Sequence, residues 1–405
     1  MNILIEIKKF IAKQILYRYK ITIPSKINKI KRKEVISVLF VLNDLSKWKS
    51  ENLYLRMLEH NAFTHILGVT YHEGESIDQQ KEKRSILEKY LKEKNYKYQI
   101  LNSTLRPNPD IVIYTEPYGN AIPKHQSVYR YFNSLFVSIN YSCHTTHLNI
   151  DYFALLHQWA WIDCYESQKA IEDAYHYIGH KRESIQLTGL PMIDKLLETP
   201  NRDPWKIQRQ YKKRIIWAPH HSLGGFDGES IIYSTFLEYA EFMLLLAKKY
   251  EDKIQMAFKP HPLLKDKLDS LWGKEKADQY YKKWADLDNG QLEIGDYHDL
   301  FVTSDALIHD CSSFIVEYQV INKPSLFIVK NLDDISKDLN RFGEDAFFAQ
   351  TLAKTQDDVE KFIIDILKGK DPSKDKRQNF LNSDIFEYSQ GKASDNIINT
   401  ILKKL

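Results

Sequence analysis

Short apolar runs that alternate with longer amphipathic segments constrain this chain most, and the alternation appears twice. In the first half the runs are rich in β-branched residues and end at polar turns, as buried strands do; they cover residues 35–42, 64–70, 110–116 and 134–141. Segments with helical spacing separate them, at residues 51–60 and 77–94. Repeated strand, helix, strand units predict a parallel sheet with right-handed crossovers.

The alternation restarts after a polar segment that breaks helices. Two prolines and an asparagine interrupt the pattern in ETPNRDPWK, residues 198–206, so we place a domain boundary after residue 200. The second set of strands is predicted at residues 214–219, 254–260, 292–295, 306–310 and 325–329. The helices of this half are predicted at residues 233–250, 264–287 and 312–322.

The pattern therefore predicts an α/β protein with two Rossmann-like domains. We expect the N-terminal domain over residues 35–200 and the C-terminal domain over residues 201–375. Residues 376–405 are expected to form a helical segment that can return to the first domain. Two such domains that face each other form a cleft, and ligands of open parallel sheets bind beyond the carboxyl ends of the strands.

The composition excludes several classes of protein. At 405 residues, with 43% hydrophobic and 27% charged residues, the chain has the balance of a soluble globular protein, and no stretch approaches the ~18 unbroken apolar residues of a membrane span. The three cysteines have no paired spacing, which indicates neither disulfides nor a zinc site and favours the cytoplasm. No dinucleotide fingerprint or Walker loop is present, so we predict no cofactor and no catalytic metal.

Residues 1–34 form a basic amino-terminal segment. Residues 1–33 contain ten Lys or Arg and one acid, a net charge of +9, against −6 for the remainder of the chain. Apolar residues recur beside these charges at helical spacing: Leu4, Ile7, Ile11, Ile15 and Tyr19. This pattern is typical of an amphipathic helix that lies on an anionic membrane surface, and equally of a helix packed on its own domain. A nucleic acid partner is not predicted, because no binding module accompanies the basic run.

Polar groups follow four strands of the second half. These strands end in WAPHHS, FKPHP, EIGDYHDL and HDCSS. A single histidine after a strand is usually an ordinary surface residue, but four polar strand ends in one sheet indicate a site. Prolines on both sides of His261 fix its backbone, which suits an imidazole that must face a ligand. Ser312 and Ser313 stand at the start of a predicted helix, where they can cap the helix or help to bind a phosphate.

These motifs resemble the carboxyl-terminal half of the CDP-glycerol glycerophosphotransferase family, which contains teichoic-acid and capsule enzymes of bacteria. The resemblance rests on KPHP, GDYHDLF, SDALIHDCSSFIVEY and NKPSLF. The family typically has an aspartate, an aromatic residue, two serines and, four residues later, an acid. In this sequence a cysteine replaces the aromatic residue, and the five positions are Asp310, Cys311, Ser312, Ser313 and Glu317.

Two further motifs of the family are matched in part. The family's first strand of this half ends in Ala-Pro-Thr, an aromatic residue and an arginine; here Ala218 and Pro219 match, and the replacements are His220, His221 and Ser222. In the first half, CHTT places His144 where the family has the histidine of a His-Gly-Thr motif. TGLPMID, residues 188–194, matches the family's Gly-x-Pro-x-x-Asp signature. Met192 stands where the family usually has an arginine.

The resemblance implies a glycosyltransferase-B (GT-B) architecture, with a nucleotide-activated donor in the second domain and the acceptor over the first. Ser312 and Ser313 are suited to a pyrophosphate, and the carboxylate of Glu317 to ribose hydroxyls. His261 can donate to a phosphate oxygen, and His144 is the candidate base for the acceptor hydroxyl. The other residues expected to line the donor site are His220, His221, Ser222, Lys259 and Asp310.

The function we predict is transfer of glycerol phosphate, or a related polyol phosphate, from a CDP-activated donor such as CDP-glycerol to a hydroxyl of a bacterial surface polysaccharide. The acceptor would be a polysaccharide or a lipid-linked chain, reached at the inner face of the cell membrane. One alternative is a GT-B glycosyltransferase that uses a nucleotide sugar, because a fold alone does not separate the two reactions. A non-catalytic binding protein on this fold would be expected to lose a serine, the acid or the KPHP histidine, and none is lost.

Overall fold

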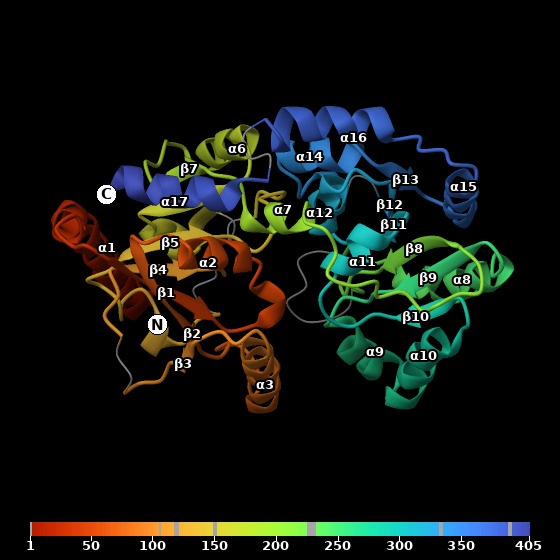
Figure 1. The fold of residues 1–405 in the computed structure, drawn as a ribbon, viewed down its shortest axis with the longest axis horizontal. Coiled ribbons are helices and arrows are strands. Elements are labelled where there is room, and N and C mark those ends of the chain that lie inside the picture. Colours follow the sequence, from red (N-terminus) through yellow and green to blue (C-terminus); the bar gives the residue numbers. More distant parts are fainter. Residues whose placement is uncertain are drawn as a thin grey trace. The chain divides into compact units, whose positions relative to one another are not determined.

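The computed structural model describes residues 2–104, 107–116, 121–148, 152–224, 232–331, 335–387 and 391–405. The chain divides into two compact units (Figure 1). Unit 1 comprises Met1–Asp194 and Tyr388–Leu405, and unit 2 comprises Lys195–Glu387. Each unit contains one parallel sheet with helices packed on it, so the prediction of an α/β protein with two parallel sheets is confirmed.

Unit 1 is built on a seven-stranded parallel sheet in the order β3-β2-β1-β4-β5-β6-β7. The strands are β1 Ile36–Leu42, β2 Phe63–Val69, β3 Tyr98–Ile100, β4 Ile111–Tyr114, β5 Leu135–Ile139, β6 Ile162–Tyr165 and β7 Ile185–Leu187. The α-helices are α1 Asn2–Ile30, α2 Glu51–Leu58, α3 Ile77–Glu93, α5 Leu155–Trp159, α6 Gln168–Ile178, α7 Pro191–Leu196 and α17 Ala393–Lys404. Short 3₁₀ turns are η1 Leu45–Lys47 and η2 Lys124–Gln126.

Unit 2 is built on a six-stranded parallel sheet in the order β10-β9-β8-β11-β12-β13. The strands are β8 Lys213–Ala218, β9 Ile254–Phe258, β10 Gly290–Leu292, β11 Ala306–His309, β12 Ser325–Ile328 and β13 Thr351–Ala353. The α-helices are α8 Phe236–Lys249, α9 Leu264–Trp272, α10 Lys274–Asp286, α11 His298–Thr303, α12 Phe314–Val320, α14 Arg341–Phe348, α15 Gln356–Leu367 and α16 Lys374–Phe380. A π-helical turn, Leu381–Ile385, follows α16.

The prediction of a single helix over residues 264–287 was wrong, because the structure has two helices in this range. α9 ends at Trp272 and α10 begins at Lys274. Gly273 between them has φ +84°, a left-handed conformation that side chains other than glycine rarely adopt. The chain therefore breaks at Gly273 although the apolar periodicity continues across it.

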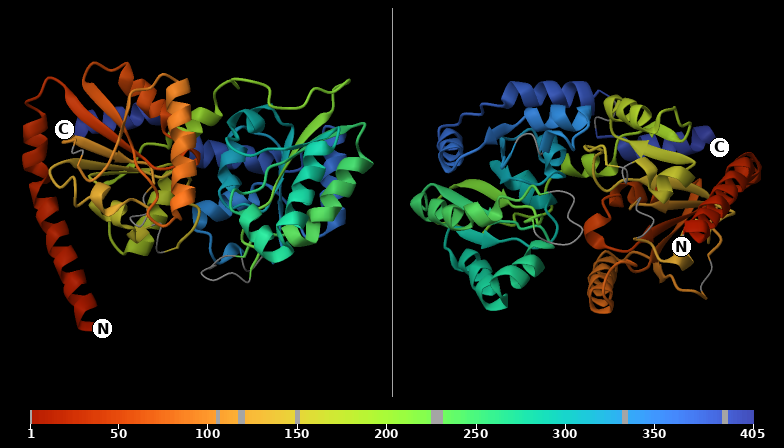
Figure 2. Two further views of the ribbon diagram at one scale, coloured as in Figure 1. Left: turned by 90° about the horizontal axis from the view of Figure 1, so that it is seen from below. Right: turned by 180° about the vertical axis from the view of Figure 1, so that it is seen from behind.

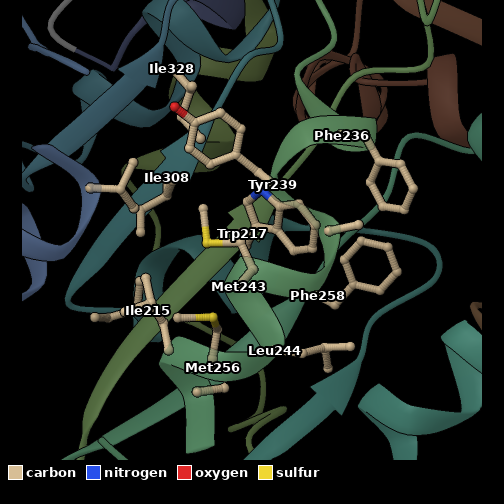
Figure 3. Packing of buried hydrophobic residues seen from close by; sticks show 14 of the residues in the cluster. Ile215, Trp217, Phe236, Tyr239, Met243, Leu244, Met256, Phe258, Ile308 and Ile328 are labelled. Atoms are coloured by element: carbon tan, nitrogen blue, oxygen red, sulfur yellow. The ribbon is translucent and has the colours of Figure 1, made fainter. Parts of the chain in front are cut away.

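Aromatic packing fixes the strands of unit 2 that carry the predicted site. Trp217 of β8 stacks on Phe236 of α8, with ring centroids 5.6 Å apart, and packs against Phe258 of β9 at 5.1 Å. Met243 and Met256 belong to the same buried cluster, part of which is shown in Figure 3. Large aromatic side chains of this kind dominate core energetics, so the ends of β8 and β9 are held in a fixed relation.

Helix α1 combines two environments. Tyr19 is fully buried, with its ring 5.1 Å from Phe136 and 4.8 Å from Trp159. Ile7 and Ile11, which belong to the same predicted apolar stripe, are exposed, and the side chain of Leu4 lies outside the described part. The amino-terminal end of α1, marked N in Figure 2, extends away from the other elements of unit 1. The second half of α1 therefore packs on unit 1, which is one of the two interpretations that the sequence allowed for this segment.

Because Tyr19 is buried and Tyr17 is exposed, we expect replacement of the two side chains to change the stability of the protein by very different amounts. Tyr19→Ala should lower the free energy of unfolding by about 3–5 kcal/mol, because it empties a buried aromatic site. Tyr17→Ala should change it by less than about 0.5 kcal/mol, because the Tyr17 side chain is exposed. Urea unfolding of both variants measures the difference, and equal effects would mean that α1 does not pack through Tyr19.

Candidate functional site

The carboxyl ends of three neighbouring strands build the predicted site in unit 2. β8 lies between β9 and β11, so the loops that follow these strands start side by side at one sheet edge. The backbone N–H of Lys259 donates to the carbonyl of Trp217 at 2.8 Å, and the N–H of His261 donates to the carbonyl of Pro219 at 3.1 Å. These bonds continue the β8–β9 pairing past the strand ends and place the KPHP loop against the loop that carries the histidine pair.

Three histidines meet at this edge. The ring centroids of His220 and His221 are 4.3 Å apart, and the ring of His261 lies 5.2 Å from the first and 4.2 Å from the second. His220 Nδ1 lies 2.8 Å from the hydroxyl of Ser222, which also accepts the backbone N–H of Tyr233 at 2.9 Å. The structure thus brings together four of the residues predicted at the donor site.

Asp310 holds these loops together. Its buried carboxylate accepts the backbone N–H of His220 at 2.5 Å, the backbone N–H of Thr235 at 2.6 Å and the Thr235 hydroxyl at 2.8 Å. Burial raises the pKa of Asp310 to about 6, although these donors favour the charged form. The contacts of Asp310 therefore connect the end of β11 to the loops before α8.

The two serines precede a helix of seven residues, α12. Ser313 makes no side-chain capping bond to the helix; its hydroxyl lies 3.1 Å from the sulfur of Cys311. Both serine side chains are half-buried. Of the two roles that the sequence leaves open for these serines, helix capping by Ser313 is therefore not observed.

The carboxylate of Glu317 has a partner that the sequence did not suggest. Glu317 is fully buried, and its Oε2 accepts a hydrogen bond from the hydroxyl of Tyr297. Tyr297 lies in the GDYHDLF motif, before α11, so the motif was recognised without a role for its tyrosine. The ammonium of Lys259 donates to the carbonyl of Gly295 at 2.8 Å and lies 5.9 Å from the Tyr297 ring. A hydroxyl group is thus the kind of partner that the Glu317 site accepts.

Hydrogen bonding assigns the proton of His261. Its Nδ1 accepts the backbone N–H of Leu263 at 3.1 Å, so in the neutral ring Nε2 carries the hydrogen. Burial, the neighbouring histidines, Lys259 and Lys267 lower the pKa of His261 to about 2. Burial and His221 likewise lower the pKa of His220 to about 3. His261 is therefore a neutral hydrogen-bond donor in a positively charged surrounding.

The three histidines could hold a metal ion by spacing, since their ligand atoms lie within 4.8 Å of one another. Two features oppose a cation. The bond from Leu263 leaves Nε2 of His261 protonated, and a protonated nitrogen has no lone pair for a metal. Two lysines also lie close enough to lower the pKa of the ring. The arrangement favours an anion such as a phosphate group.

Unit 1 contains the remaining predicted residue, His144, in the loop after β5. Glu166, directly after β6, accepts the backbone N–H of His144 at 2.6 Å and contacts its Nδ1 at 2.9 Å. The His144 ring stacks on Tyr165 at 4.0 Å. Because the carboxylate accepts from Nδ1–H, Nε2 carries the lone pair, as a general base requires.

Sequence reasoning missed Glu166 and a second buried pair beside it. His157 of α5 contacts the carboxylate of Asp163 in β6 at 2.9 Å, and its ring lies 5.9 Å from that of His144. The only signal for Glu166 was an acidic residue directly after an apolar segment, which is common. The pairing itself depends on the adjacency of β5 and β6 in the sheet.

Comparison with known proteins finds a family match over the second part of the chain, which includes the motifs of unit 2. A family model described as CDP-Glycerol:Poly(glycerophosphate) glycerophosphotransferase matches residues 164–403. The teichoic acid ribitol-phosphate polymerase TarL of Staphylococcus aureus is 25% identical over 236 residues, which cover 55% of this chain and 38% of the relative. A teichoic acid glycerol-phosphate transferase of the same organism is 25% identical over 248 residues, 58% of each chain. The chain thus matches between about two fifths and three fifths of the length of these curated relatives.

Solved structures share the fold. A variant of the wall teichoic acid polymerase TagF, soaked with CDPG, superposes with a TM-score of 0.59 at 13% identity and covers 97% of each chain. UDP-GlcNAc 2-epimerase from Neisseria meningitidis, bound to UDP-GlcNAc, gives a TM-score of 0.58 at 15% identity, over 91% of this chain and 100% of the epimerase. At these identities the likeness concerns the fold alone, which is GT-B-like with two parallel sheets.

The raised pKa of Asp310 predicts a pH-dependent stability. Its contribution should be fully present below the ordinary pKa of 3.8 and lost as the pH rises through about 6. Asp310→Asn cannot titrate, so the difference in free energy of unfolding between wild type and variant should shrink from about pH 4 to about pH 7. Urea unfolding across this range measures it. A difference that stays constant would show that Asp310 keeps an ordinary pKa.

Proposed function

The chain belongs to the CDP-glycerol:poly(glycerophosphate) glycerophosphotransferase family, and from this premise we propose that it transfers a polyol phosphate from a CDP-activated donor to a hydroxyl of a bacterial surface polysaccharide. Glycerol phosphate and ribitol phosphate are the units named for its relatives, and the proposal covers both. The acceptor would be a teichoic-acid-like or capsule polymer.

The observation that carries this proposal is the protonation of His261. A neutral imidazole whose Nε2–H points away from its own backbone partner can donate to a phosphate oxygen, and Lys259 and Lys267 supply positive charge beside it. Phosphoryl transfer depends mainly on positioning and on neutralising the charge of the departing phosphate. No covalent nucleophile is required for such a transfer.

The proposed step balances without a cofactor. The acceptor oxygen bonds to the phosphorus that carries the polyol, the bond from that phosphorus to the bridging oxygen breaks, and CMP leaves. His144 takes the proton of the acceptor hydroxyl at Nε2, while Glu166 holds the imidazole through Nδ1 and stabilises its charged form. His261 donates to the phosphate oxygen on which negative charge builds. A ribose hydroxyl would take the place of the Tyr297 hydroxyl on Glu317.

We also propose that the exposed face of α1 binds an anionic membrane surface, where a lipid-linked acceptor would be found. Apart from the buried face, α1 has a second, exposed apolar face at helical spacing, made by Ile7, Phe10, Ile11, Tyr17 and Ile21. The net charge of +9 in residues 1–33 complements anionic lipid. Among the described residues, no helix combines the length and hydropathy needed to cross a bilayer. Surface binding through α1 would place the enzyme at the inner face of the membrane.

Replacement of His261 and replacement of His144 should have different effects on donor binding and on the rate of transfer. His261→Gln should weaken CDP-glycerol or CDP-ribitol binding roughly tenfold or more, because a hydrogen bond to a charged group contributes about 1.5–3 kcal/mol, and should also slow transfer. His144→Gln should slow transfer while donor affinity, measured by calorimetry, is unchanged. His180→Gln, at an exposed position, is the control. Binding of UDP-sugars but of neither CDP-polyol would contradict the proposed function and favour a sugar transferase.

The structure indicates which amino-terminal residues can be removed without loss of core contacts. Removing residues 1–11 takes away three exposed apolar side chains and leaves Tyr19 in the core, whereas removing residues 1–30 would empty the Tyr19 site. We expect the shorter truncation to keep its melting temperature and its activity on a soluble acceptor, but to bind phosphatidylglycerol vesicles more weakly in a flotation assay, because it removes exposed apolar side chains and leaves most of the positive charge in place. Phosphatidylcholine vesicles are the control. Full-length protein that ignores anionic vesicles at low salt would refute membrane binding.

A further inference from the structure

Four polar residues form one row across the sheet of unit 1, directly past the strand ends. The register pairs Leu42 of β1 with Val69 of β2, so Asn43 and Thr70 follow at one level. It also pairs Val41 with Tyr114, and Tyr114 with Ser138, which brings Glu116 and Asn140 to the same level. We call these four residues the polar row: Thr70, Asn43, Glu116 and Asn140.

All members of the polar row are buried. The carboxylate of Glu116 accepts from Asn43 Nδ2 at 2.8 Å, pairs with the ammonium of Lys47 and lies 3.6 Å from Nε2 of His72. Although burial acts in the opposite direction, His72 and Lys47 keep the pKa of Glu116 below its ordinary value. An ionised carboxylate thus sits near the middle of the row, with its charge balanced by neighbouring side chains.

Among the residues that the structure describes, two atoms of the row have no hydrogen-bond partner. Among the described residues, no group lies within hydrogen-bond distance of Thr70 Oγ1 or Asn140 Oδ1, and both atoms are buried. A buried polar atom without a hydrogen bond costs free energy, so such atoms at the carboxyl edge of a parallel sheet point to a ligand that supplies the missing bonds. The two atoms lie directly past the ends of β2 and β5, on opposite sides of Asn43 and Glu116.

We propose that the polar row is the acceptor subsite and binds the hydroxyl groups of a polyol or sugar; this inference rests on the proposed transferase function. The loop with His144 leaves the sheet from β5, four residues after Asn140. The subsite therefore lies on the same strand end as the candidate base.

The chemistry of the row selects hydroxyls over phosphate. Asn140 Oδ1 and the Glu116 carboxylate are acceptors, so the ligand must donate hydrogen bonds, which a hydroxyl does and an ionised phosphate does not. The negative charge of Glu116 repels a phosphate, and the ammonium of Lys47, the cation beside it, already pairs with that carboxylate. The subsite would thus bind the hydroxyl-bearing end of the acceptor and not its phosphodiester backbone.

The test uses Thr70→Val and Asn140→Ala, singly and together, in the full chain. Each lost bond to an acceptor hydroxyl should raise the KM for acceptor about fivefold to tenfold, with CDP-polyol affinity unchanged. Thr70→Val removes a hydroxyl without a partner among the described residues, so its melting temperature should not fall. Ser325→Ala, which removes a buried hydroxyl of the same kind from β12 of unit 2, is the matched control and should leave KM unchanged.

A second experiment measures binding of the polyol directly and does not depend on catalysis. Saturation-transfer NMR should detect ribitol or glycerol on the wild-type chain, lose the signal in the double variant and keep it in the presence of inorganic phosphate. Equal polyol signals in wild type and double variant, no polyol signal on the wild type, or displacement by phosphate would each overturn the subsite. Failure of CDP-glycerol and CDP-ribitol to bind would instead overturn the proposed function, so the two failures are distinguishable.

Discussion

The parallel pairing of strands is the constraint on which both candidate sites depend. In a parallel sheet every strand ends at the same edge, so residues distant in sequence become neighbours only if their strands are adjacent. In unit 2 the order β9-β8-β11 collects His261, His220 and Asp310. In unit 1 the order β2-β1-β4-β5-β6 collects the polar row and the His144–Glu166 pair. Buried charges occur at both edges, where backbone and side-chain donors can compensate them.

Much of this arrangement could be predicted from the sequence, because the strands that carry it are apolar runs bounded by polar turns. β1, β8 and β11 were expected within one or two residues, since β-branched residues between polar turns admit few other structures. β3, β6, β7 and β13 were missed. β6 reads IDCY and β7 reads IQL, so polar residues interrupt the apolar pattern, and these strands are stabilised by their neighbours in the sheet.

What the sequence could not provide is pairing between side chains. Tyr297 on Glu317 and Glu166 on His144 join residues that are 20 and 22 positions apart, and neither partner carries a local signal of the other. The polar row requires the register of four strands, because a shift of one residue would move each member to the other face of the sheet. Residue types at strand ends can thus be read from the sequence, but their protonation and partners require the structure.

Protonation is where the two candidate histidines differ most. Glu166 accepts a hydrogen from Nδ1 of His144 and leaves a lone pair on Nε2, whereas the Leu263 N–H occupies Nδ1 of His261 and leaves a hydrogen on Nε2. One ring is prepared to accept a proton and the other to donate a hydrogen bond, although the residue type is the same. Transfer to a hydroxyl needs both roles at neutral pH, since a base must be unprotonated while the phosphate finds a donor. Burial and the neighbouring histidines lower the pKa of His261 and keep its ring neutral; the nearby lysines act in the same direction and also attract the anion to which the ring donates.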